Sequence, residues 1–387
     1  MFILINFIGM IRILNVVDSL KLGSGIMGVI MNYYRALDRS EVQFDFLYFL
    51  DTERNHSNEI KDLGGFIYKL PMLSISSVYS FHKNIYSFMK HLDYEYKIIH
   101  LHEVLLNAPV FFNAKRLNIP IRIIHSHNSV GAETKLKKIR NKILTMPLKK
   151  ISTDFFACSD SAGLFLYGER YMRSKKIKIL NNAVDLDTYE FNPFVRDEIR
   201  KKYNIRDSHV IGHVGSFCIQ KNHDFLIDIF NEYLKLEPQA VLMLIGDGKL
   251  KVDIHRKVQN LGIDKNVIFV GKVSNVKDYL NAIDILVMPS LFEGLPVVGV
   301  EAQANSLPCV FSDEITKSVV LLPSTELLSL KSSPKEWACL IDKKIRNKEH
   351  LTIRRQCVKK ELTQKGFSIK EEAKKLQDYY RKRISDL

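Results

Sequence analysis

The chain has 387 residues, more than a single hydrophobic core usually serves, so its length predicts two domains. Apolar residues make up 46% of the sequence and charged residues 26%, as in ordinary globular proteins. The formal charge of +14 at pH 7 indicates an anionic partner such as nucleic acid, anionic lipid or a phosphorylated ligand, unless it reflects only a lysine-rich composition.

The cysteines argue against a zinc or redox site. They are odd in number, widely scattered and never spaced as a Cys-x-x-Cys pair, which favours reduced thiols in a cytoplasmic protein. They lie at Cys158, Cys218, Cys309, Cys339 and Cys357.

The N-terminal residues 1–17 are apolar but lack the basic leader and small-residue cleavage site of an export signal. Asn6 and Arg12 interrupt the run, which is also too short to span a bilayer. Residues 11–17 are expected to form the first buried strand. Residues 1–9 are interpreted as an upstream extension, and the sequence leaves open whether translation starts at Met1 or Met10.

Short apolar runs alternate with amphipathic helical stretches along the chain. The runs are residues 11–17, 42–48, 98–101, 121–125 and 155–158 in the first half, and 210–214, 241–245, 267–270, 283–288 and 308–311 in the second. This alternation predicts parallel sheets with right-handed crossovers, and hence an α/β fold of two doubly wound, Rossmann-like domains. A ligand is expected at the carboxyl edges of the strands, in the crevice between the domains.

Two pairs of histidines end strands in the first half. His100 and His102, with Glu103, resemble a metal site at first sight, but strand alternation fixes no third ligand, so no metal is predicted. His125 and His127 end the next strand and offer hydrogen-bond donors and acceptors to a ligand, or they could equally be a satisfied edge of the sheet.

The segment 135–150 places apolar residues among many cations. Such a basic amphipathic stretch suits an anionic membrane surface, and a solvated helix packed on the first domain is an equal alternative. Nucleic-acid binding is disfavoured, because the aromatic residues are spread through core patterns and no nucleic-acid-binding module is present.

The domain boundary is expected after residue 187, since the turn-forming residues 181–187 precede a charged helix at 195–203. This division gives domains of residues 1–187 and 188–367. The final stretch, 368–387, has a helical pattern with exposed Lys, Glu and Arg.

Two glutamates eight positions apart mark the most informative segment, residues 289–302. An apolar strand, a Gly/Pro turn and a helix start follow one another there, so Glu293 lies on a loop and Glu301 about two turns into the helix. The backbone around Gly294, Leu295, Pro296 and Val297 then forms a positive helix end, which suits a diphosphate. Paired carboxylates beside such a cradle predict a nucleotide-sugar site.

This segment resembles the signature of the family 4 retaining glycosyltransferases, which have the GT-B fold, and the chain is similar to their capsule and exopolysaccharide branch. Supporting stretches, in the expected order and spacing, are residues 24–35, 125–128, 180–185, 212–217 and 220–223. The resemblance implies that the C-terminal helix 368–387 packs back on the first domain.

The family likeness also implies roles for particular residues. Glu301 would hold the nucleotide ribose, and Glu293 with the turn after it the donor-sugar hydroxyls and phosphates. Lys221 would reach the diphosphate as a point charge in place of a metal. His125 would bind the donor sugar or lend charge to the leaving phosphate. Ser24 and Gly25 would bring backbone close to phosphate or acceptor.

The sequence departs from the family at Ser216, which follows Gly215 where an arginine is usual. Losing a bidentate phosphate contact would weaken donor binding by roughly 1.5 to 3 kcal/mol, about ten- to a hundredfold. Ser306 stands where the family tends to have glycine, and Asn305 is expected to supply the left-handed cap conformation at the helix end.

The predicted function is therefore a retaining glycosyltransferase that needs no metal or other cofactor. It would move a hexose or N-acetylhexosamine from a UDP-sugar to a lipid-linked glycan for capsule or exopolysaccharide. The expected location is the cytoplasm, with the inner face of the plasma membrane as a peripheral site. Two alternatives remain open: a nucleotide-sugar epimerase on the same fold, and a non-catalytic nucleotide-sugar-binding scaffold, which Ser216 makes conceivable.

Overall fold

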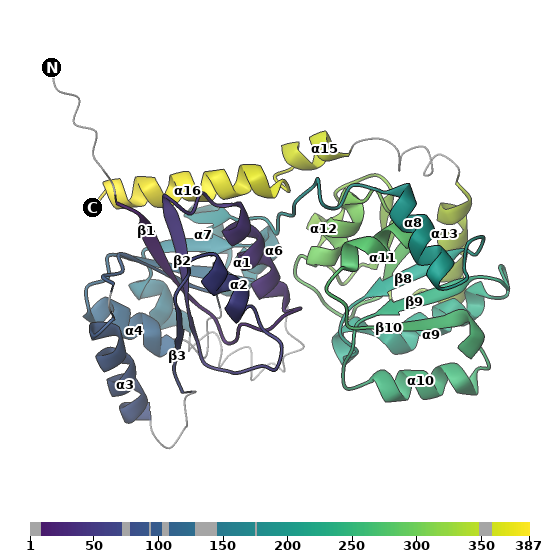
Figure 1. The fold of residues 1–387 in the computed structure, drawn as a ribbon, viewed down its shortest axis with the longest axis horizontal. Helices are drawn as coiled ribbons and strands as arrows, with labels where there is room; N and C mark the ends of the chain where they lie inside the picture. Colours follow the sequence, from purple (N-terminus) through teal and green to yellow (C-terminus); the bar gives the residue numbers. More distant parts are fainter. Residues whose placement is uncertain are drawn as a thin grey trace. The chain divides into compact units, whose positions relative to one another are not determined.

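The chain divides into two compact units, Met1–Ala183 with Ile369–Leu387, and Val184–Ser368. The computed structural model describes residues 9–71, 78–92, 94–102, 108–127, 145–174, 176–347 and 358–387. Within these residues no helix combines the length and the apolar character needed to cross a membrane. Each unit is built around its own parallel sheet (Figure 1).

The first unit contains a seven-stranded sheet in the order β3-β2-β1-β4-β5-β6-β7. All the strand pairs are parallel. The strands are β1 (Ile11–Val16), β2 (Val42–Tyr48), β3 (Ile67–Lys69), β4 (Ile98–Leu101), β5 (Ile121–Ser126), β6 (Asp154–Ala157) and β7 (Ile177–Ile179). Every residue of the central strands β1 and β4 is buried, as expected for a parallel sheet covered on both faces.

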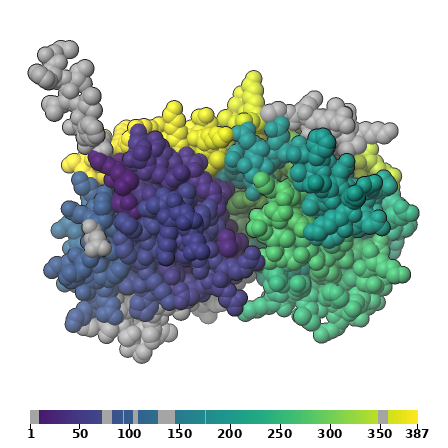
Figure 2. All heavy atoms as spheres, in the orientation of Figure 1, coloured from purple at the N-terminus to yellow at the C-terminus, as the bar shows by residue number. Residues whose placement is uncertain are grey.

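The helices of the first unit come from both ends of the chain. They are α1 (Gly25–Ala36), α2 (Ser57–Asp62), α3 (Val78–Lys90), α4 (Ala108–Arg116), α6 (Asp160–Tyr167), α7 (Glu169–Arg173) and α16 (Ile369–Ser385). Helix α16, yellow in Figures 1 and 2, packs on α1 and buries Ala373, Leu376 and Tyr380. The last helix of the sequence is therefore part of the first unit.

The second unit contains a six-stranded parallel sheet in the order β10-β9-β8-β11-β12-β13. Its strands are β8 (Val210–Val214), β9 (Val241–Ile245), β10 (Val267–Gly271), β11 (Ile285–Met288), β12 (Cys309–Ser312) and β13 (Thr325–Leu328). Its helices are α8 (Pro193–Lys202), α9 (His223–Tyr233), α10 (Lys251–Asn260), α11 (Val276–Ala282), α12 (Val297–Ala304), α13 (Pro334–Arg346) and α15 (Lys359–Gln364), with 3₁₀ turns η2 (Ile219–Lys221), η3 (Asp264–Asn266) and η4 (Lys317–Val319).

Strand order reverses between β8 and β11, and the helices that follow these two strands cover opposite faces of the sheet. Helix α9 contributes Leu226 and Phe230 to one hydrophobic cluster, whereas α12 contributes Val300 and Ala302 to the cluster on the other face. The chain therefore leaves β8 and β11 toward opposite faces of the sheet, and ligands of open parallel sheets usually bind at the carboxyl edge of such a topological switch point. Strands β1 and β4 form the corresponding point in the first unit.

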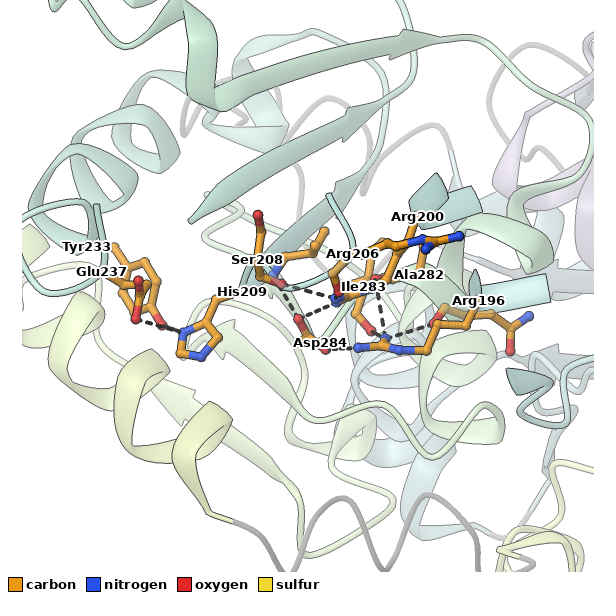
Figure 3. A network of polar contacts seen from close by, with 12 residues as sticks. Arg196, Arg200, Arg206, Ser208, His209, Tyr233, Glu237, Ala282, Ile283 and Asp284 are labelled. Atoms are coloured by element: carbon orange, nitrogen blue, oxygen red, sulfur yellow. Dashed lines mark hydrogen bonds and ion pairs between the residues drawn. The ribbon is translucent and has the colours of Figure 1, made fainter. Parts of the chain in front are cut away.

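A partly buried ion network closes the opposite, amino-terminal edge of the second sheet (Figure 3). Arg196 Nη2 lies 2.6 Å from Asp284 Oδ1, and Arg200 Nη2 lies 2.5 Å from Asp284 Oδ2. The backbone N–H of Val210 donates to the same carboxylate at 2.8 Å. Arg200 also donates to the carbonyls of Ala282, Arg206 and Ser208. The network thus fixes α8 to the start of β8 and β11.

The predicted strand positions agree closely with the structure. The runs at 42–48, 98–101, 210–214 and 241–245 coincide with β2, β4, β8 and β9, and the other runs differ by at most two residues at either end. Three strands were missed, β3, β7 and β13, and each of them lies at the edge of a sheet. The chain divides after Ala183, four residues before the predicted boundary.

Candidate functional site

The loops after β8 and β11 are tied together at the switch point of the second unit. The backbone N–H of Leu291 donates to the carbonyl of Gln220 at 2.8 Å. The Gln220 side-chain amide donates to the carbonyl of Phe292 at 3.0 Å, and that of Asn222 to the carbonyl of Pro289 at 3.0 Å. Sequence reasoning did not assign Gln220 or Asn222, although both flank Lys221. These bonds hold the lysine loop against the glutamate loop.

Lys221 and Glu293 form an ion pair between these loops. Lys221 Nζ lies 2.5 Å from Glu293 Oε1, and the two side chains are 15% and 10% exposed. Glu293 also pairs with Ile315 through an isolated parallel bridge, which fixes its backbone. The structure therefore brings together a predicted diphosphate-binding cation and a predicted sugar-binding carboxylate, at a place where water screens their charges weakly.

Gly215 gives the Lys221 side chain its path to Glu293. A Cβ atom at position 215 would lie 3.0 Å from Lys221 Cε, 3.1 Å from Lys221 Cδ and 3.2 Å from His213 Nε2. These distances are tighter than ordinary van der Waals contacts, so a larger residue would push the lysine aside. Ser216, the next residue, is exposed. The position where the family has arginine therefore has room for a long side chain.

The turn after Glu293 leads directly into α12. Pro296 occupies the cap position and has no side-chain acceptor for the first backbone N–H groups of the helix. Leu295 is buried in the core and anchors the turn, while Gly294 and Val297 are partly exposed. The helix start, shortly after Glu293 in the chain, thus presents partial positive charge.

Glu301, within α12, accepts a hydrogen bond of 2.7 Å from the Tyr189 hydroxyl. Burial raises the pKa of Glu301, and the Tyr189 hydrogen bond partly opposes that rise. Tyr189 was not assigned from the sequence, where it is an ordinary aromatic residue before the helix α8. The carboxylate keeps acceptor capacity beyond this one bond, because an ionised carboxylate offers about four lone-pair sites.

Two buried histidines, His213 at the end of β8 and His223 at the start of α9, flank the lysine loop in the chain. His213 Nδ1 is 2.8 Å from the carbonyl of Val287 and must donate to it, so its Nε2, which faces Gly215, is an acceptor. Burial lowers the pKa of His213 well below its usual range and that of His223 to about 4. Both rings are therefore neutral at pH 7, and Lys221 supplies the cationic charge of this loop.

In the first unit, four histidines gather at the carboxyl ends of β4 and β5. His100 pairs in register with Ile123, which sets His102 level with His125 on the neighbouring strand. The His125 and His127 rings lie 3.9 Å apart, and the His100 and His102 rings 4.2 Å apart. His125 is 1% exposed and borders a cavity of only about 10 Å³, whereas His127 is partly exposed. A sugar could reach His125 only if neighbouring side chains moved.

The histidine cluster also bears on metal binding. Nitrogen atoms of His100, His102 and His125 lie within 4.8 Å of one another. Both ring nitrogens of His102 are already engaged, by His127 and Asn15, and His100 Nδ1 contacts the Tyr380 hydroxyl at 3.0 Å. A metal held by all three rings would break this network. Glu103, the further ligand considered from the sequence, lies outside the described residues.

Ser24 and Gly25 start α1. The Ser24 hydroxyl accepts the N–H of Met27 at 3.4 Å and so caps the helix. A Cβ atom at Gly25 would meet no heavy atom within 4 Å, so the backbone there is accessible. The predicted glycine-loop role stays a prediction, and Ser24 has a structural task as helix cap. Most of the basic segment 135–150 lies outside the described residues.

Two doubly wound parallel sheets of this kind define the GT-B glycosyltransferase architecture. A crystal structure of HepE from Anabaena in complex with UDP-glucose matches with a TM-score of 0.79 at 16% sequence identity, and covers 97% of this chain and 100% of that chain. The predicted fold class is therefore confirmed.

Sequence comparison identifies the family. The model described as "Glycosyl transferases group 1" matches residues 195–361. EpsF of Bacillus subtilis, named as a glycosyltransferase, is 31% identical over 373 residues, which are 95% of this chain and 96% of EpsF. The capsular polysaccharide biosynthesis glycosyltransferase CapH of Staphylococcus aureus is 25% identical over 352 residues, 89% of this chain and 93% of CapH.

A third relative is the UDP-Gal:alpha-D-GlcNAc-diphosphoundecaprenol alpha-1,3-galactosyltransferase of Escherichia coli. It is 28% identical over 240 residues, 60% of this chain and 62% of that protein. This chain belongs to the group 1 glycosyltransferases, and its relatives include enzymes of polysaccharide biosynthesis. The predicted family and enzyme class are confirmed.

Proposed function

We propose that this glycosyltransferase moves a hexose or N-acetylhexosamine from a UDP-sugar to a lipid-linked glycan, with retention at the anomeric carbon. The observation that carries the proposal is the Lys221–Glu293 pair at the β8/β11 switch point, next to the start of α12. The UDP-glucose bound by HepE supports a UDP-sugar donor, and the diphosphoundecaprenol acceptor named for the Escherichia coli relative supports a lipid-linked acceptor.

The donor diphosphate would bind Lys221 and the backbone N–H groups at the start of α12. Both stabilise the negative charge that builds up on the departing diphosphate. Catalysis of this kind needs no metal ion, because the ammonium group and the helix end supply the positive charge. Glu293 would then exchange its ion pair for hydroxyls of the donor sugar.

Glu301 would accept hydrogen bonds from hydroxyls of the nucleotide ribose. Burial has already removed much of the water around the Glu301 carboxylate, which lowers the cost of binding these hydroxyls. Retention would require attack from the same face as the leaving group, with the departing phosphate accepting the proton of the acceptor hydroxyl. Ser24 and Gly25 would act from the first unit on the donor or acceptor, and His125 would do so only after the side chains that cover it had moved.

The enzyme is proposed to work in the cytoplasm, on the inner face of the plasma membrane where lipid-linked acceptors reside. The formal charge of +14 supports an anionic membrane surface. Capsule or exopolysaccharide biosynthesis is the proposed pathway class, by analogy with CapH.

The decisive experiment is a transfer assay with a panel of nucleotide-sugars, a lipid-linked acceptor and no added metal, followed by NMR of the product anomer. Thermal shift with the same panel identifies the donor, because a bound ligand raises apparent stability by mass action. Transfer with retained configuration, lost in Glu293→Gln, is the expected result. Full turnover in Glu293→Ala, an inverted product or strict dependence on a metal would contradict the proposal.

Ser216, which stands where an arginine is usual in the family, favours one second candidate, a non-catalytic nucleotide-sugar-binding scaffold. Tight UDP binding without transfer to any lipid acceptor would support it. Incubation with UDP-N-acetylglucosamine alone tests the epimerase alternative, for which a new sugar-nucleotide isomer would be the sign.

A further inference from the structure

Asn15, at the switch point of the first unit, has a fixed amide orientation. Its side chain is fully buried on β1. Asn15 Nδ2 lies 3.3 Å from the carbonyl oxygen of Ile13 and 3.3 Å from that of Asp45. Carbonyl oxygens only accept hydrogen bonds, so the NH₂ group of Asn15 must face them. The Oδ1 atom of Asn15 is consequently left on the other side as an acceptor.

The hydrogen bond to Asn15 fixes the tautomer of His102. His102 Nε2 lies 3.0 Å from Asn15 Oδ1, so Nε2 must carry the hydrogen. Burial keeps the pKa of His102 well below its usual range, and a neutral imidazole carries one N–H only. His102 Nδ1 is therefore an acceptor.

The same argument extends to His127. Its Nε2 lies 3.0 Å from His102 Nδ1, so His127 Nε2 must be the donor. Burial lowers the pKa of His127 to about 3, which leaves the ring neutral at pH 7. Its Nδ1 thus carries a lone pair and no hydrogen. Asn15 and His102 are buried, whereas His127 is partly exposed at the carboxyl edge of the sheet.

We propose that Asn15 and His102 are positioning residues that fix the tautomer of His127, so that Nδ1 of His127 accepts a hydrogen bond from a sugar hydroxyl. This inference rests on the proposed function. A lone pair repels the anionic oxygens of a diphosphate and attracts an O–H group, which assigns His127 to a hydroxyl rather than to the leaving group.

The hydrogen bonds that link Asn15, His102 and His127, here called the relay, predict a tautomer of His127 that can be measured without any enzymatic activity. The full-length protein is labelled with ¹⁵N in its histidine rings, and the His127 signals are assigned by their loss in His127→Asn. We expect an unprotonated Nδ1 and a protonated Nε2 in the wild type. Asn15→Leu and His102→Leu should each yield a mixture of tautomers at His127. A protonated Nδ1 in the wild type, or no change in either folded variant, would overturn the relay.

Kinetics test the second half of the inference with a matched pair of substitutions. Asn at position 127 places an amide oxygen near the site of Nδ1, whereas Gln places its amide near Nε2. His127→Asn should therefore retain more transferase activity than His127→Gln, which should lose about tenfold to a hundredfold in kcat/KM. His102→Gln, which keeps a donor and an acceptor, should recover activity that His102→Leu loses. His255→Asn, at an exposed histidine on α10, is the control.

Failure of this inference is distinct from failure of the proposed function. If the wild type transfers sugar and both His127 variants lose activity equally, the hydroxyl-accepting role is wrong while the transferase function stands. If no sugar is transferred by the wild type, the tautomer measurement still decides whether Asn15 and His102 set the state of His127.

Discussion

The charged groups at the two edges of the second sheet differ in how fully their interactions are satisfied. At the amino-terminal edge, Asp284 is neutralised by Arg196 and Arg200 and receives the N–H of Val210 (Figure 3). At the carboxyl edge, Lys221 and Glu293 form one ion pair on two loops, beside a helix start that no side chain caps. Among the described residues, His213 Nε2 is buried there without a hydrogen-bond partner.

This difference separates polar groups that hold the fold from polar groups that are available to a ligand. A saturated network gains nothing from further partners and is lost only on unfolding. A buried acceptor without a partner and a helix start that no side chain caps can take up groups of a substrate, at a cost in stability. Substitutions at the two edges should therefore separate stability from activity.

The largest effect on stability is expected from Asp284→Ala. It leaves two arginines, one of them only 4% exposed, without their carboxylate, which should lower the free energy of unfolding by about 3–5 kcal/mol. Denaturant titration with hydrogen exchange of the second unit measures the loss. Asp253→Ala removes the partner of Arg256 in an exposed pair and should change stability by less than about 0.5 kcal/mol. A similar loss in both variants would contradict the distinction.

The largest effect on activity is expected from Lys221→Met, which should reduce kcat about 10²- to 10³-fold by removing a cation from the departing diphosphate. The loss of stability should be smaller than for Asp284→Ala. Steady-state kinetics with the best donor provide the measurement, and Lys235→Met, which removes an exposed lysine paired with Glu232, is the control. A normal kcat in Lys221→Met would place the diphosphate elsewhere.

Ser216→Arg should strengthen nucleotide binding at the carboxyl edge of the second sheet. The position is exposed, and an added guanidinium can contact phosphate oxygens in bidentate fashion, so the Kd for UDP should fall about tenfold or more. Isothermal titration at two salt concentrations measures the change and its electrostatic part. Ser216→Gln provides a neutral side chain of intermediate length, and equal gains in both variants would exclude the charge as the cause.

The smallest effect is expected from Glu301→Gln, and the direction of its effect on stability follows from the pKa of Glu301. Burial raises the folded-state pKa of Glu301 above its unfolded value, so the ionised carboxylate disfavours the folded state at neutral pH. The variant should therefore be slightly more stable than the wild type at pH 7, and this advantage should disappear as the pH falls through the folded-state pKa. Thermal melts from pH 4 to 7.5 test the trend, while nucleotide affinity should decrease.

The fold was largely predictable because its central strands are continuous apolar runs between amphipathic helices. Strands β3, β7 and β13 escaped prediction because they are only three or four residues long and lie at sheet edges, where Lys69, Lys178 and Glu326 interrupt the apolar pattern. The resemblance correctly pointed to the glycosyltransferase family through the segment 289–302.

The pairings within the site could not be predicted from spacing. Lys221 meets Glu293 only because β8 and β11 are neighbours in the sheet, which is a property of topology. Alternation places His125 and His127 on one face, but it cannot show which of them is covered. Residues of α1 and α16, including Val29 and Leu376, line the small cavity beside His125.

The membership of α16 in the first unit has a consequence for how this protein is made. The helix that buries Tyr380 against His100 leaves the ribosome only after the whole second unit has been translated. A nascent chain must therefore keep an apolar surface of its N-terminal half uncovered while the inserted half folds. We expect folding of the N-terminal half to depend most on chaperones, although that half is synthesised first. A premature stop codon before residue 369 should likewise impair folding of the N-terminal half most.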